Sequence, residues 1–187
     1  VTRAIDPVAL ERGRMAQVSG GVAPTPETVG DTLVYVALQE LATRISHMNT
    51  AKLLDDKTGH DVMARVAADE NLHHLFYRDV TAAALELEPS GMVEAIERQV
   101  RSFAMPGVGV PDFAMHASRI ANAGIYDFAE FHERILLPVV LGRWKLEVVE
   151  GLSAAAERAR DRLLHRIGRI GTVARRVTER RGELAAT

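Results

Sequence analysis

The chain of 187 residues contains no cysteine. This absence excludes disulfide bonds, thiolate zinc sites, iron–sulfur clusters and a cysteine nucleophile. Any metal ion that the protein binds must therefore be held by histidine and carboxylate side chains, and candidate sites are found by looking for those residue types at helical or strand spacing.

The sequence also lacks a long apolar run and a strong net charge. No stretch of about 18 consecutive apolar residues is present, and the residues up to Pro7 carry no apolar core of a secretory signal. The formal net charge is -2, which argues against a dedicated nucleic-acid-binding protein. We therefore expect a cytoplasmic protein without a membrane span and without a nucleic-acid partner.

Segments with a helical period, separated by proline and glycine, predict an all-α fold, because no segment shows the alternation of a half-buried strand. We predict one helical domain over residues 1–169, followed by a basic tail at 170–187 that has few apolar residues and tends to fray. A kink or a restart is expected at Pro138. The predicted helices cover approximately residues 7–20, 31–57, 60–87, 89–105, 112–124, 127–138 and 153–169.

The end of the chain is rich in arginine. Residues 154–187 contain nine arginines against Glu157, Asp161, Glu179 and Glu183. Such a segment is most often a solvated helix with ion pairs between successive turns, and its functional interpretation is a docking surface for an acidic partner. The interspersed acids and the absence of interleaved aromatic residues make it a poor nucleic-acid surface.

The two longest predicted helices carry carboxylate and imidazole groups among apolar residues. Glu70 and His73 lie three positions apart, so that a carboxylate and an imidazole point to the same place one turn apart. Helix bundles present ligands to a pair of iron or manganese ions in this way. On the preceding helix, Glu40 shares a face with Thr43 and His47. The stripe around the first pair comprises Met63, Val66, Ala67, Glu70, His73, Tyr77, Val80 and Ala84.

Each of these residues also has a simpler interpretation. A Glu-x-x-His pair most often lies on a solvated helix face or forms an ion pair. Its position inside an apolar stripe is the observation that favours a metal site here. Asp69 and His74, one step round the helix, fit supporting or rim positions better than ligand positions. His47 fits a hydrogen-bonded core histidine. The remaining histidines share no spacing and are expected at the surface: His60, His116, His132 and His165.

Four blocks of the sequence resemble the soluble acyl-[acyl-carrier-protein] desaturases of plastids and actinobacteria, and the mycobacterial members most of all. Their order and spacing match those of the family from about Arg3 to about Arg169. Four co-linear blocks are far more specific than one Glu-x-x-His pair. The blocks are residues 39–51 (QELATRISHMNTA), 67–73 (AADENLH), 141–145 (LGRWK) and 151–154 (GLSA).

The resemblance implies a ferritin-like bundle with two iron ions (Fe2+, with manganese as an alternative in purified protein). The implied reaction uses O2 to remove two hydrogens from a saturated acyl chain carried on acyl carrier protein. Ferredoxin is implied as the electron donor, and a homodimer as the assembly. By position in the motifs, the resemblance makes Glu40, Glu70 and His73 metal ligands. It also makes Asp69 an acid that orients a ligand, and it places Thr43 beside the oxygen site.

The chain departs from the family pattern in two ways. It matches only the later part of the family, so the bundle is expected to be partial, without the first two metal-bearing helices, and the fragment alone is expected to be inactive. Leu72 and His74 stand where many relatives carry arginine and glutamate. Three functions therefore remain open: a desaturase, a catalytically incomplete relative that binds metal or carrier protein without chemistry, and a metal-storage bundle.

Overall fold

The computed structural model describes residues 6–20, 26–105 and 112–185. Within these ranges every regular element is a helix, which confirms the predicted all-α fold. No helix there is both long and apolar enough to cross a membrane. The elements are α1 (Pro7–Gly20), α2 (Val29–Leu53), α3 (Lys57–Leu87), α4 (Pro89–Ser102), α5 (Phe113–Asn122), α6 (Phe128–Phe131), the π-helix η1 (His132–Arg143), the 3-10 helix η2 (Leu146–Val148) and α7 (Ala154–Ala185).

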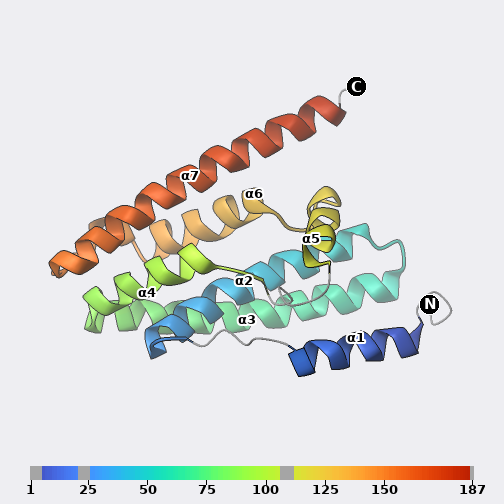
Figure 1. The fold of residues 1–187 in the computed structure, drawn as a ribbon, viewed down its shortest axis with the longest axis horizontal. Coiled ribbons are helices and arrows are strands. Elements are labelled where there is room, and N and C mark those ends of the chain that lie inside the picture. The colour runs from blue at the N-terminus through green and yellow to red at the C-terminus, as the bar shows by residue number, and fades with distance from the viewer. Residues whose placement is uncertain (1–5, 21–25, 106–111, 186–187) are drawn as a thin grey trace.

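The helices α2 and α3 form an antiparallel hairpin, with the two rods side by side in Figure 1. The turn between them lies earlier than the sequence predicts, because Asp56 caps α3 by accepting a hydrogen bond from the Gly59 N–H at 2.6 Å. Gly59 therefore belongs to the first turn of α3. The predicted end of the first rod near Lys57 is wrong, since α2 ends at Leu53.

One side of the hairpin is covered by α4 and η1, and α7 packs on α4, α6 and η1 as the outermost helix (Figure 1). Apolar side chains of α2, α4, η1 and α7 form one continuous buried core. Each Å2 of apolar surface removed from water stabilises the folded state by about 25 cal/mol, so this core is the main stabilising contribution to the fold. Its largest fully buried side chains include Val34, Leu38, Ile45, Val93, Ile96, Ile135, Leu136, Val140, Leu146 and Leu163.

The segment after α5 begins as predicted, with Asp127 accepting hydrogen bonds from the backbone N–H groups of Ala129 and Glu130. The helix does not restart at Pro138, and a kink there stays a prediction. The chain continues as a π-helix to Arg143, with an i to i−5 hydrogen bond from the Trp144 N–H to the Val139 carbonyl at 2.8 Å closing it. Pro138 itself is exposed, so its ring lies at the surface of the helix.

The last helix is longer than the sequence predicts. α7 continues beyond Arg169 to Ala185, so its described part is not a frayed tail. Ile170 packs against the core and Ala174 is buried, which extends the apolar face of α7. Gly171 permits the close approach of η1, because a Cβ atom there would lie 2.6 Å from Nε2 of His132. The domain boundary proposed at residue 169 stays a prediction.

Candidate metal centre

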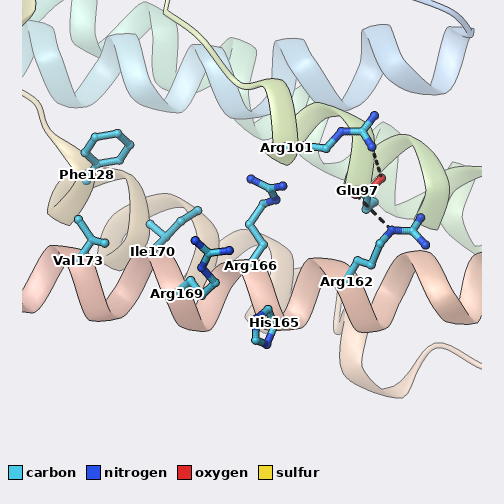
Figure 2. A pocket seen from close by; sticks show the side chains of 9 residues that line it. All are labelled: Glu97, Arg101, Phe128, Arg162, His165, Arg166, Arg169, Ile170 and Val173. Atoms are coloured by element: carbon cyan, nitrogen blue, oxygen red, sulfur yellow. Dashed lines mark ion pairs between the residues drawn. The ribbon is translucent and has the colours of Figure 1, made fainter.

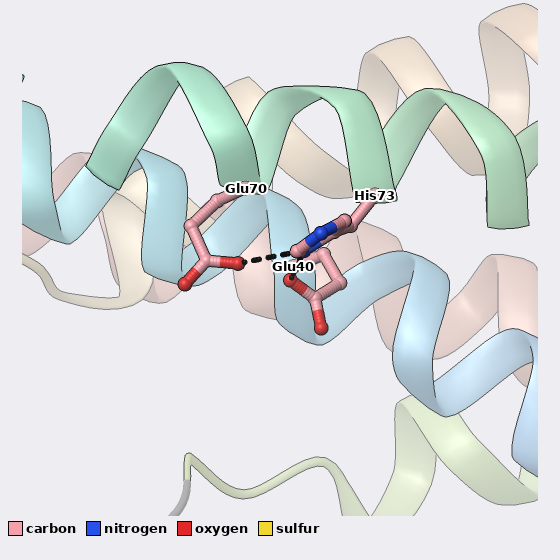
Figure 3. A group of neighbouring side chains, drawn as sticks. All are labelled: Glu40, Glu70 and His73. Carbon is pink, nitrogen blue, oxygen red and sulfur yellow. Dashed lines mark hydrogen bonds and ion pairs between the residues drawn. The ribbon is translucent and has the colours of Figure 1, made fainter. Parts of the chain in front are cut away.

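Three of the predicted ligands come together between α2 and α3. Glu40 extends from α2, and Glu70 and His73 extend from successive turns of α3 (Figure 3). One ligand atom from each lies within 4.8 Å of the others. Nδ1 of His73 is 3.3 Å from Oε2 of Glu70 and 3.4 Å from Oε2 of Glu40. This spacing can hold one metal ion among the three side chains.

The cluster is enclosed on one side and open on the other. The side chains of Glu40 and Glu70 are 16% and 20% exposed, whereas that of His73 is 58% exposed. The two carboxylates are therefore set into the groove between the helices, and the imidazole stands at its rim. A cation bound here would meet the carboxylates first and keep an accessible coordination side.

The proximity of the two carboxyl groups shifts their pKa values in opposite directions. Burial, together with the neighbouring Glu70, raises the pKa of Glu40 to about 7. The hydrogen bond with Glu40 and the interaction with His73 lower the pKa of Glu70, and the hydrogen bond to Glu70 raises the pKa of His73. Burial and the neighbouring carboxyl group thus favour the neutral form of Glu40, and a bound cation would offset this penalty on its charge.

Buried polar atoms in the cluster that lack a well-aligned hydrogen bond also favour a bound cation. Oε2 of Glu40 is buried and receives no well-aligned hydrogen bond, although Nδ1 of His73 lies 3.4 Å away. Nδ1 of His47, 3.9 Å from Oε1 of Glu70, is buried in the same way. A buried carboxylate oxygen without a donor is costly unless a cation compensates it. Two carboxylates and an imidazole, without a thiolate, suit iron or manganese.

The other two predicted site residues lie at different distances from this cluster. The Thr43 hydroxyl is half-buried one turn after Glu40 and donates to the carbonyls of Gln39 and Glu40, the latter at 3.0 Å. Asp69 points away, since its carboxylate pairs with Arg65 at 3.4 Å. The structure therefore keeps Thr43 beside the cluster and does not bring Asp69 into it; the roles of both residues stay predictions.

His74 holds the hairpin together. Its buried ring contacts the Ala37 carbonyl through Nδ1 at 2.8 Å, and burial lowers its pKa, so the ring is neutral and donates. This bond fixes α3 against α2 at the residue next to His73. A rim position for His74 is therefore wrong. The seven-residue step from the buried Ala67 to His74 was the signal in the sequence.

Two side chains of the block at residues 141–145 are hydrogen-bonded to α3. The Trp144 indole N–H donates to the Arg78 carbonyl at 3.0 Å, and the Arg143 guanidinium donates to Asp79 at 3.1 Å. These bonds tie the end of η1 to α3 one to two turns beyond His73. The block thus positions the helix that carries two of the three ligands.

A second feature is a basic groove between α4, α6 and α7, with a volume of about 520 Å3 (Figure 2). The buried Glu97 carboxylate belongs to its lining, 3.7 Å from Arg101 and 3.7 Å from Arg162. One end of the groove is apolar. Its lining consists of Glu97, Arg101, Phe128, Arg162, His165, Arg166, Arg169, Ile170 and Val173.

An all-helical fold with a Glu and Glu-x-x-His cluster between two of its rods defines a class of metal-binding helical bundles. Comparison with known proteins then gives the family. A sequence model described as fatty acid desaturase matches residues 1–187, and the chain belongs to that family.

The similar proteins support this assignment. A Mycobacterium tuberculosis protein named acyl-[acyl-carrier-protein] desaturase DesA1 is 39% identical over 171 residues, which covers 87% of this chain and 50% of the relative. The chloroplastic stearoyl-[acyl-carrier-protein] 9-desaturase 6 of Arabidopsis thaliana is 31% identical over 200 residues, covering 98% of this chain and 49% of the relative. The chain thus spans about half the length of these relatives.

A solved structure supports the fold. The X-ray structure of the acyl-ACP desaturase DesA2 of Mycobacterium tuberculosis H37Rv superposes with a TM-score of 0.66. The match covers 85% of this chain and 59% of that chain, at 23% sequence identity. At this identity the match concerns the fold, and it confirms the predicted helical bundle of the ferritin-like type.

Proposed function

We propose that this chain is the part of an acyl-[acyl-carrier-protein] desaturase that supplies one helical hairpin of the metal centre. The reaction would be the O2-dependent insertion of a double bond into a saturated acyl chain carried on acyl carrier protein. The observation that carries the proposal is the convergence of Glu40, Glu70 and His73 within 4.8 Å, in a chain of the desaturase family.

Each ligand would have a distinct task. The carboxylates of Glu40 and Glu70 would bind the metal and neutralise its charge, and the exposed His73 ring would complete the group from the rim. A bound pair of iron ions would supply the redox chemistry that activates O2 against an unactivated C–H bond. The half-buried Thr43 hydroxyl would stand one turn from the ligands, where it can hold or pass on a proton.

The partners follow from the same proposal. Acyl carrier proteins are acidic, and the basic groove along α7 offers Arg162, Arg166 and Arg169 to a negatively charged surface. Its apolar end, at Phe128 and Val173, would receive the less polar part of such a partner. Ferredoxin as the electron donor and a homodimeric assembly are proposed from the resemblance to the family.

The test is a desaturation assay on the natural polypeptide that contains this sequence. Its intact mass is measured first, to establish the length of the chain that is assayed. The proposal predicts unsaturated acyl chains from acyl carrier protein thioesters, dependent on reduced ferredoxin and O2, detected by gas chromatography. Glu70→Gln should abolish product, whereas Glu86→Gln on the same helix should not. An iron-loaded preparation of family length that forms no product would contradict the proposal.

A catalytically incomplete metal-binding protein is the second candidate. It is favoured by the high exposure of His73. In that case a polypeptide with the 20.5 kDa mass of this chain would load metal at the three ligands and would release no unsaturated product.

A further inference from the structure

The basic groove has an excess of positive charge that comes from two helices packed against each other, α4 and α7. Arginines line it from both sides: Arg101 on α4, and Arg162, Arg166 and Arg169 within about two turns of α7. Among the lining residues that the structure describes, Glu97 alone is acidic. Four guanidinium groups therefore face one carboxylate in a concave site.

Glu97 neutralises only part of this charge. Its side chain is 5% exposed, and its oxygen atoms lie 3.7 Å from nitrogen atoms of Arg101 and Arg162, beyond hydrogen-bond distance. The side chains of Arg166 and Arg169 have no ion-pair or hydrogen-bond partner among the described residues. Because like charges repel more strongly in a groove than on an open, solvated helix face, a bound anion would stabilise this arrangement.

The number of arginines favours a phosphate over a carboxylate as this anion. A phosphate monoester carries up to two negative charges and three free acceptor oxygens. Guanidinium groups bind such oxygens through paired hydrogen bonds. A single arginine can satisfy a carboxylate in this way, whereas the groove offers three arginines on α7 and a fourth on α4.

The other end of the groove is apolar and indicates what the phosphate is attached to. Figure 2 shows Phe128 and Val173 at this end, with Ile170 between them and the arginines. Phe128 and Val173 are 63% and 46% exposed, so both have apolar surface left to bury. A sugar or a nucleobase would find no polar side chain among the described lining residues there, whereas an alkyl chain needs none.

The length of the groove allows both parts to bind together. From Arg162 to Val173 it follows eleven residues of α7, which is about 16 Å. A phosphate group alone is much shorter than this. The charged part and the apolar part are thus arranged end to end along one helix, as the two parts of an amphiphilic ligand are.

We propose that the groove between α4 and α7 binds a phosphate monoester of an apolar chain. The phosphate would bind Arg162, Arg166 and Arg169, and the chain would lie over Phe128 and Val173. This inference goes beyond the proposed function, because it requires neither the metal ligands nor the carrier protein. A carrier protein that docks on the same arginines would compete with this ligand.

The experiment titrates octyl phosphate, below its critical micelle concentration, into the natural polypeptide that contains this sequence. Isothermal titration calorimetry should show one site per chain. The affinity should be at least about tenfold higher than for inorganic phosphate, because burial of a few methylene groups supplies that factor. Octanoate, with a carboxylate on a chain of similar length, should bind at least about tenfold more weakly than octyl phosphate.

A double variant tests the charged part of the groove. Arg166→Gln combined with Arg169→Gln should weaken the binding of octyl phosphate by about tenfold or more. The control is Arg158→Gln combined with Arg176→Gln, which makes the same change in net charge outside the groove lining and should leave the affinity unchanged. All four arginines are exposed, so neither double variant removes a buried side chain.

Phe128→Ala tests the apolar part. It should weaken the binding of octyl phosphate by about fivefold or more and leave the binding of inorganic phosphate unchanged, because only the chain contacts the ring. Phe76→Ala is the matched control, since Phe76 is also 63% exposed and lies on α3, outside the lining of the groove. It should bind both probes as wild type does.

Three results with soluble probes would overturn the proposal. These are equal affinities for octyl phosphate and octanoate, an unchanged affinity in the Arg166 and Arg169 double variant, and an unchanged affinity in Phe128→Ala. Binding to vesicles that contain phosphatidic acid, without binding of soluble octyl phosphate, would also overturn it and make the groove a membrane-contact surface. The desaturation assay tests the metal ligands separately, so failure of either proposal leaves the other standing.

Discussion

Nδ1 of His73 lies 3.4 Å from Oε2 of Glu40, a residue 33 positions earlier on the neighbouring helix. Only the register of the hairpin produces this contact, and that register is held by the bond of His74 to the Ala37 carbonyl. The proximity of Glu40, Glu70 and His73 is thus a direct consequence of how α3 packs against α2.

Loss of either ligand on α3 should remove metal binding and leave the helices in place. We expect Glu70→Gln and His73→Ala to retain little or no Fe2+ after gel filtration, because two remaining ligands hold the ion weakly. Far-ultraviolet circular dichroism should be unchanged, since both side chains lie at the edge of the core. Glu86→Gln and His60→Ala on the same helix should load normally; equal loading of all four variants would refute the assignment.

Glu40→Gln should separate stability from metal binding. The folded protein raises the pKa of Glu40 to about 7 from 4.5, so an ionised Glu40 disfavours the folded state. As pH rises from about 5 to 8, the unfolded chain loses this proton first and wild-type stability falls. In chelator, the neutral variant should melt at a higher temperature than wild type at pH 8, with little difference at pH 5.

The control for this experiment is Glu86→Gln, which should not change the melting temperature at either pH. A Glu40→Gln protein that melts below wild type at pH 8 would mean that the ionised carboxylate is stabilised in the folded protein. With Fe2+ present the order should reverse, because wild type gains stability from the ion and the variant does not.

Asp31 links the start of α2 to α4, and its removal should be strongly destabilising. Its buried carboxylate accepts hydrogen bonds from Arg98 at 3.0 Å and Gln99 at 3.0 Å, and from Thr28, the N-cap of α2. Asp31→Ala leaves the Arg98 charge without its main partner. We expect a loss of about 3–5 kcal/mol in urea unfolding.

Glu27→Ala is the matched control for Asp31, because the exposed Glu27 carboxylate also faces Arg98, at 3.7 Å. It should cost less than about 1 kcal/mol. Burial opposes ionisation of Asp31, but its hydrogen bonds outweigh this and lower its pKa below 3.8. The stabilisation is therefore complete above about pH 4 and is lost as pH falls through the lowered value. Equal losses for the two variants would contradict this account.

Reversal of charge in the basic groove should weaken the binding of acyl carrier protein. Arg166→Glu combined with Arg169→Glu replaces two cations of the groove, and we expect at least about tenfold weaker binding with a shallower dependence on salt. Arg176→Glu, outside the groove lining on the same helix, is the control. If isothermal titration calorimetry gave the double variant and the Arg176→Glu control equal affinity for acyl carrier protein, α7 would be an ordinary solvated helix and not a docking surface.

Much of the fold could be predicted from the sequence because its signals are local. Proline, glycine and capping residues locate the helices, and the cap at Asp127 is confirmed. The π-helix through Pro138 could not be predicted, because a proline indicates where an α-helical hydrogen bond is lost and not which wider pairing replaces it. The continuation of α7 beyond Arg169 was also missed, because the segment has few apolar residues to mark a buried face.

The candidate site could be predicted only in part. The i, i+3 spacing of Glu70 and His73 on one helix ensures that they meet, whereas Glu40 depends on the register between two helices, which periodicity does not determine. Glu40 was singled out by its place on the face of the preceding helix, and the resemblance to the family added its assignment as a ligand. His74 was expected at a supporting or a rim position, and only the seven-residue step from Ala67 indicated that its ring is buried in the hairpin.

The central claim is that Glu40, Glu70 and His73 hold a metal ion, and anomalous diffraction tests it most directly. Crystals of the 187-residue chain grown with Fe2+ should give an anomalous peak at the iron absorption edge between these three side chains, at about 2.0–2.3 Å from the ligating oxygen and nitrogen atoms. Iron bound at another place, or these side chains pointing to separate neighbours with no peak between them, would contradict the account.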